Sequence, residues 1–187
     1  MLLLALLIVF GGSPLPPDVK PWPIGVEPGY RLRAAPPPVL RAERIGRFRC
    51  ETGRAPRFGV HLELFVRRQV VIVPAAIGVA RPFRQRFARV APGRCSYPLR
   101  TLDPTGVIEV RLGSRATLGD FFRLWGQQLG RHRIAGFRTR VPVLAFVGGK
   151  RWRGHPGSIP LRRHAQIVLE LGGYVPPHPR YLFVSRL

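Results

Sequence analysis

One stretch, residues 117–129 (TLGDFFRLWGQQL), constrains the fold more than any other because its apolar residues recur at helical spacing. They form a single stripe along a helix: Leu118, Phe121, Phe122, Trp125 and Leu129. Thr117 is the expected N-cap, Asp120 suits the positive end of the helix, and Gly130 is expected to end it in a left-handed conformation. The pattern predicts one main helix whose aromatic face packs into a core.

Several shorter segments alternate apolar and polar residues, as strands with one buried face do. Residues 61–66 (HLELFV) and 69–73 (QVVIV) predict a first hairpin. Residues 141–147 and 150–153 predict a second one, which turns at Gly148-Gly149 because glycine accepts the positive φ angles of a tight turn.

Two further strands are expected, at residues 106–112 and 166–171. The first of them has one all-apolar face, expected to point into the core: Ile108, Val110 and Leu112. Residues 74–78 are expected to end the first hairpin, and the basic residues 79–93 that follow are expected to be irregular.

The order of these elements is hairpin, strand, helix, hairpin, strand. It predicts an α+β fold with a mixed sheet of four or five strands and one main helix packed on it, and the ubiquitin-like β-grasp is one candidate arrangement. A chain of 187 residues is long enough for one full hydrophobic core. We therefore expect residues 45–187 to form a single globular domain that ends in a Pro-rich tail.

The N-terminal residues 1–13 resemble a signal peptide, because the apolar run MLLLALLIVF is followed by small residues. The run is shorter than the roughly 20 residues that cross a bilayer as a helix. No Lys or Arg precedes it, so Met1 is either the true start or an internal residue of a longer signal, and an apolar core element is the alternative. Residues 14–44 are rich in proline and predict an extended linker. We therefore expect an extracytoplasmic protein, secreted or membrane-anchored.

The charge balance is strongly basic: 31 Lys and Arg against 9 Asp and Glu give a net charge of +22. Only Lys20 and Lys150 are lysines, so nearly all the cations are arginines. The surplus reflects either the Arg-rich coding of a GC-rich genome or selection for phosphate binding. Either way we expect the surface to adhere to anionic lipid or to a cell-envelope polymer at low salt. Residues 83–89 (FRQRFAR) also place aromatic rings beside arginines, a pattern typical of nucleic-acid binding.

The chain has two cysteines, Cys50 and Cys95. In an exported protein they are expected to form a disulfide, which stabilises by roughly 3–4 kcal/mol through loop closure. In a cytosolic protein they are expected to be free thiols. Neither belongs to a CxxC motif.

From Arg49 to the C-terminus the chain resembles an uncharacterised family of exported bacterial proteins. Seven blocks carry the resemblance: Cys50-Glu51 before HLELFV, VPAAIGV (73–79), Cys95 followed by LRTLD (99–103), GVIEV (106–110), TLGDFFRLWGQ (117–127), FVGGKRW (146–152) and IPLRRHAQI (159–167). TLGDFF-x-x-WGQ is the most specific of them. The resemblance implies a globular exported domain and brings no established activity with it.

The histidines of that family pattern (HxHxH and then LHTHD) are largely replaced in this chain. The clustered imidazoles of the pattern suit zinc or copper. The corresponding positions here hold Arg57, Gly59 and His61, and then Arg100 and Leu102. Arginine stays protonated and cannot ligate a cation. His61 and Glu109 remain as candidate metal ligands, with Cys50 or Cys95 as further donors, and no cofactor is expected.

The sequence contains no nucleophile elbow, P-loop, H-E-x-x-H or dinucleotide-binding glycine motif, and no enzymatic activity is predicted. The first hypothesis is an exported or membrane-tethered, non-catalytic binding domain of unknown ligand, a His-depleted relative of the family. One alternative is an Arg-rich nucleic-acid-binding protein. The other is a metal-binding protein that uses His61.

Overall fold

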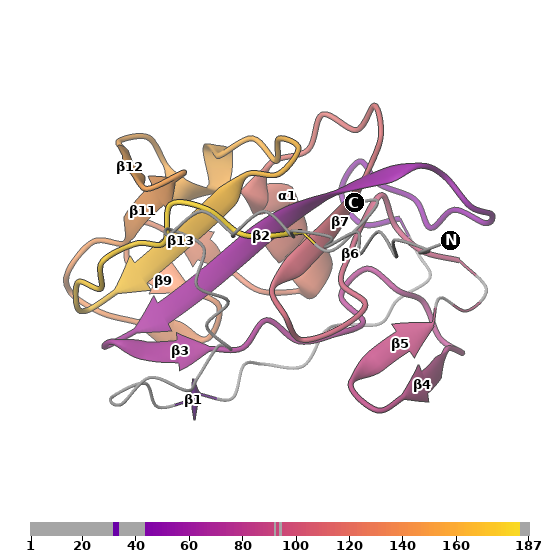
Figure 1. Ribbon diagram of the computed structural model, residues 1–187, viewed down its shortest axis with the longest axis horizontal. Coiled ribbons are helices and arrows are strands. Elements are labelled where there is room, and N and C mark those ends of the chain that lie inside the picture. The colour runs from indigo at the N-terminus through magenta and orange to yellow at the C-terminus, as the bar shows by residue number, and fades with distance from the viewer. Residues whose placement is uncertain (1–31, 34–43, 92, 94, 184–187) are drawn as a thin grey trace, which may run out of the picture.

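A computed structural model of the chain describes residues 32–33, 44–91, 93 and 95–183 (Figure 1). The predicted signal-like segment 1–13 and nearly all of the predicted linker 14–44 lie outside the described residues. The helices are α1 (Leu118–Trp125) and the short 3-10 helix η1 (Pro156–Ser158). The strands are β1 (Leu32–Arg33), β2 (Arg57–Val66), β3 (Gln69–Val71), β4 (Arg84–Arg86), β5 (Arg89–Ala91), β6 (Leu99–Arg100), β7 (Val107–Arg111), β8 (Leu129–Gly130), β9 (Arg133–Ile134), β10 (Phe137–Arg138), β11 (Leu144–Val147), β12 (Lys150–Trp152) and β13 (Gln166–Leu171).

The main sheet is mixed, and its central strands β2 and β13 run parallel. β3 forms an antiparallel hairpin with β2 on one side of this pair, and the antiparallel hairpin β11–β12 adjoins β13 on the other side. The order is therefore β3-β2-β13-β11-β12. With α1 between the hairpins in sequence, this is the arrangement of a β-grasp. The predicted α+β class, with a mixed sheet and one main helix, is confirmed.

The sheet is larger than the four or five strands expected. It has eight strands, because β7 and β6 extend it beside the first half of β2 and β1 pairs with β3. The alternation that predicts β2 from His61 extends back to Arg57, since Phe58 and Val60 continue the buried face of Leu62 and Leu64. The additional residues at the start of β2 pair with β7, on the edge of β2 that faces away from β13.

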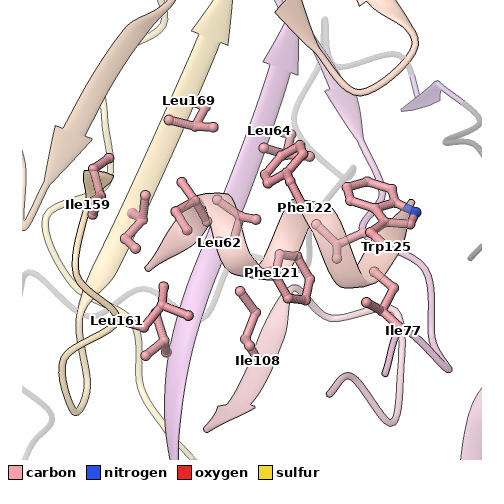
Figure 2. Close-up of a cluster of buried hydrophobic side chains, with 14 of the residues drawn as sticks. Leu62, Leu64, Ile77, Ile108, Phe121, Phe122, Trp125, Ile159, Leu161 and Leu169 are labelled. Atoms are coloured by element: carbon pink, nitrogen blue, oxygen red, sulfur yellow. The ribbon is translucent and has the colours of Figure 1, made fainter. Parts of the chain in front are cut away.

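The helix covers one face of the sheet. Phe121, Phe122 and Trp125 are buried and pack toward the apolar side chains of β2 and β7 (Figure 2). The predicted N-cap is confirmed: Thr117 and Asp120 form a reciprocal capping box.

The predicted end of the helix at Gly130 is wrong. Gly126 already adopts the left-handed conformation (φ 73°) and ends the helix four residues earlier. Leu129 therefore lies on β8 and not on the helical stripe, although it still packs against the core.

Both grasp hairpins turn through two residues with positive φ. In β11–β12 these are Gly148 and Gly149, as predicted. In β2–β3 they are Arg67 and Arg68, with φ values of 50° and 64°.

Other differences from the predictions arise where strands are short. Leu112 is 58% exposed and not in the core, because β7 ends at Arg111. β11 begins at Leu144, and Val141 before it is exposed. The stretch expected to be irregular contains the separate hairpin β4–β5, and β8, β9 and β10 form a small three-stranded sheet. Strands of two or three residues are too short to show alternation.

Cys50 and Cys95 form a disulfide across 45 residues, with the two Cα atoms 5.5 Å apart. The bridge joins the segment before β2 to the segment before β6, which also pair through Glu51 and Ser96. Within the described part of the chain, no helix is long and apolar enough to cross a membrane.

Candidate functional site

The face of the sheet that points away from α1 carries a row of buried and partly buried polar side chains. Because β2 and β13 alternate and run parallel in register, His61, Glu63, Gln166 and Glu170 all lie on this face. Their neighbours along each strand point to the other face of the sheet, into the core under α1.

The C-terminal segment 174–183, here called the C-terminal strap, covers this polar row. It was predicted only as a Pro-rich tail, yet it crosses β13 and β2 (Figure 1). Three contacts fix it: a His178–Glu63 pair at 2.9 Å, a Tyr181–His61 ring stack at 3.7 Å and a Phe183–His164 stack at 4.8 Å, measured between ring centroids for the stacks. The sheet thus lies between a helix on one face and an extended segment on the other.

His61, the candidate metal ligand, is 1% exposed and both of its ring nitrogens have partners. Nδ1 lies 2.7 Å from Oε1 of Gln166, and Nε2 lies 2.9 Å from the carbonyl oxygen of Thr105. Burial lowers the pKa of His61, and the nearby Glu63 carboxylate opposes that shift. The imidazole is therefore neutral at physiological pH.

A neutral imidazole carries one N–H, so the Thr105 carbonyl must accept it from Nε2. Nδ1 then needs a donor. The buried Nε2 of Gln166 has no hydrogen-bond partner in its present orientation. Turning the Gln166 amide over places its NH2 group on Nδ1, so that both nitrogens of the imidazole have a partner. These contacts give His61 a structural role under the strap.

Glu109, the other candidate ligand, is on β7 opposite Gly59, on the same face as His61. It is 7% exposed and forms an ion pair with Arg100 at 2.7 Å. Burial, and then the charge of Arg100, lower the pKa of the neighbouring Arg57 to about 10, so this guanidinium also stays charged at neutral pH. The structure brings His61 and Glu109 to one face but engages each with a different partner.

The other proposed metal donors, Cys50 and Cys95, form the disulfide and therefore have no thiolate to offer a metal ion. Among the described residues, no group of three His, Cys, Asp or Glu side chains is placed to hold a metal ion.

Glu170 was not singled out by the sequence, because it lies within an apolar strand. It is completely buried, and neither carboxyl oxygen has a hydrogen-bond partner among the described residues. Burial raises the pKa of Glu170 to about 7, which the nearby amide of Val175 and the charge of Arg151 offset only in part. A buried carboxyl group of this kind can be recognised from sequence when a carboxylate lies in a strand that is buried on both faces. All six residues of β13 are buried, but burial of its second face depends on the strap.

The exposed surface is dominated by arginine. Every described carboxylate except Glu170 has an arginine or histidine partner: Arg111–Glu51 (2.6 Å), Arg89–Asp103 (2.7 Å), Arg100–Glu109 (2.7 Å), Arg47–Asp120 (2.9 Å) and His178–Glu63 (2.9 Å). These pairs leave most of the described arginines without a carboxylate partner. The uncompensated positive charge therefore lies at the surface.

Two open hollows lie within this basic surface. One, of about 400 Å³, lies between Arg47, Arg111 and Arg115 beside Leu112. The other, of about 700 Å³, is formed by the hairpin β4–β5 and Asp103. The second coincides with the basic, aromatic segment noted in the sequence, and it has the most exposed large apolar side chain among the described residues, Phe87 at 89%.

No protein-family model, no curated protein and no solved structure matches the chain. The resemblance to a family of exported proteins therefore stays a prediction.

Proposed function

We propose that this chain is an extracytoplasmic, non-catalytic domain that binds a polyanion of the cell envelope. One observation carries the proposal: the described carboxylates are paired with arginine or histidine, or are buried, whereas most of the arginines on the surface lack a carboxylate partner. A surface of this kind attracts a phosphate-rich or carboxylate-rich ligand over distances near the Debye length.

The Cys50–Cys95 disulfide supports the extracytoplasmic part of the proposal, because such bonds persist mainly in oxidising compartments. The signal-like residues 1–13 point the same way. Intact mass and thiol counting on protein from fractionated cells test this part. We expect an oxidised protein in the envelope or secreted fraction. A reduced, full-length protein in the cytosol, bound to nucleic acid, would overturn it.

The state of the polar side chains supports binding over catalysis. Both nitrogens of His61 are occupied, and Glu109 is held by Arg100. General acid–base catalysis requires a group that can reach a substrate proton. Both groups face protein partners instead.

The ligand class is tested by measuring binding of the oxidised, full-length protein to polyphosphate and to vesicles that contain phosphatidylglycerol. We expect binding to both, with an affinity that falls at least tenfold between about 50 mM and about 300 mM salt, because the Debye length shrinks. Neutral dextran and vesicles of phosphatidylcholine alone are the controls. Equal binding to charged and uncharged probes would contradict the proposal.

A further inference from the structure

The hairpin β4–β5 stands apart from the main sheet. It forms its own two-stranded sheet, in which Arg84 pairs with Ala91 and Arg86 with Arg89, and it extends from the side of the molecule (Figure 1). Val90 anchors it: its side chain is buried in a small apolar cluster, and its N–H donates to the carbonyl oxygen of Leu102 at 2.7 Å. The hairpin therefore has a fixed base and a free tip.

Phe87 forms that tip. It is the first residue of the turn and has a φ of 53°, a conformation in which glycine or asparagine is usual and a bulky residue is strained. Its side chain is 89% exposed, more than any other large apolar side chain among the described residues. Neither local backbone preference nor burial among the described residues explains a phenylalanine here, which points to an external partner.

The partner must tolerate positive charge, because arginines surround the ring. Arg84 and Arg86 are exposed and have no carboxylate partner in the described part of the chain. Arg89 is held by Asp103 at 2.7 Å, and the guanidinium of Arg86 lies 5.8 Å from the centre of the Phe87 ring. An apolar tip with two uncompensated cations beside it is amphipathic.

We infer that the hairpin β4–β5 docks on an anionic lipid bilayer, with Phe87 inserted at the acyl boundary and Arg84 and Arg86 on lipid phosphates. Interfacial anchors of this composition combine a shallowly buried apolar group with basic residues that bind anionic headgroups. The inference rests on the proposed function and assigns it a partner and a contact surface.

Single-stranded nucleic acid is the competing partner, because bases stack on aromatic rings beside arginine. Two observations favour lipid. Phe87 is a single ring at an apex, whereas the neighbouring Phe83 is half-buried beneath the hairpin, so the described surface offers no row of rings for successive bases. The disulfide also favours a compartment outside the cytosol.

The test measures partition of the oxidised, full-length protein onto vesicles by co-sedimentation. Wild type is expected to bind vesicles that contain phosphatidylglycerol and not those of phosphatidylcholine alone. Phe87→Ala is expected to weaken partition about tenfold, and Arg84→Gln with Arg86→Gln by a similar factor. Leu182→Ala is the matched control, because Leu182 is an exposed apolar residue outside the hairpin, and it should bind like wild type.

The variant Phe87→Trp measures how deeply the tip of the hairpin inserts into the bilayer. We expect its added tryptophan emission to shift to the blue on anionic vesicles and to be quenched by brominated acyl chains, after subtraction of the wild-type signal. The exposed position of Phe87 means that these variants fold, which far-UV circular dichroism checks.

The failure modes are distinguishable. If wild type binds no polyanion at all, the proposed function fails. If it binds anionic vesicles and Phe87→Ala binds equally well, the hairpin inference is wrong while the proposed function stands. If single-stranded DNA binds more tightly than vesicles and Phe87→Ala abolishes that binding, the hairpin is a base-stacking site and the lipid assignment is overturned.

Discussion

Replacing Glu170 with glutamine is expected to make the protein more stable at pH 8 than the wild type. The carboxyl group is buried without a hydrogen-bond partner, and its pKa is raised from 4.5 to about 7. The folded protein therefore holds a proton that the unfolded chain has lost. The contribution of Glu170 to the stability of the wild type must therefore fall as the pH rises from about 4.5 to about 7, and stay level above that range.

The magnitude follows from the two pKa values. One pKa unit corresponds to about 1.4 kcal/mol, so ionising Glu170 costs the folded state about 2–3 kcal/mol more at pH 8 than at pH 5. Glutamine has nearly the same shape and no charge. The free energy of unfolding of Glu170→Gln relative to wild type should therefore rise by that amount between pH 5 and pH 8.

Guanidinium denaturation followed by the fluorescence of the buried Trp125 measures both proteins. Taking the difference removes the contributions of other titrating groups. Glu109→Gln is the matched control: it breaks the ion pair with Arg100 and should lower stability by about 1–3 kcal/mol. If the difference between Glu170→Gln and wild type does not change from pH 5 to pH 8, the carboxyl has a partner and the reasoning is wrong.

Three further predictions concern other parts of the fold. Replacing both Cys50 and Cys95 with alanine should lower the free energy of unfolding by roughly 3–4 kcal/mol, measured in guanidinium, whereas a loss below about 1 kcal/mol would show that the bridge adds little. Thr117→Ala should cost about 1 kcal/mol through the lost cap, and Thr117→Ser should restore most of it in thermal melts. Tyr181→Ala should uncover the imidazole of His61 and raise its pKa toward the ordinary value, as followed by an NMR titration, and an unchanged titration would show that the strap does not bury it.

The central strands and the helix were predictable because their patterns are long. β2 alternates over ten residues and α1 carries a complete apolar stripe, so burial of one face determines both elements. The end of the helix was less predictable, since Gly126 and Gly130 are both suitable stops and the local sequence does not rank them.

The candidate site was only partly predictable. The ring and the arginines around Phe87 were visible in the sequence, but their projection on a hairpin was not, because β4 and β5 are three residues each. His61 and Glu109 were noted as possible metal ligands. Their actual partners, Gln166 and Arg100, come from other strands, and such pairings depend on a sheet register that no local pattern contains.

The parallel pair at the centre of the sheet determines when this protein can fold. Gln166 pairs with His61 across 105 residues, so the middle of the sheet lacks a strand until almost the whole chain has been made. Contacts this distant in sequence form late and slowly, because a long loop must close first. A nascent chain of this design cannot complete its central sheet during synthesis, and an incompletely folded chain is the state that the export we propose would require.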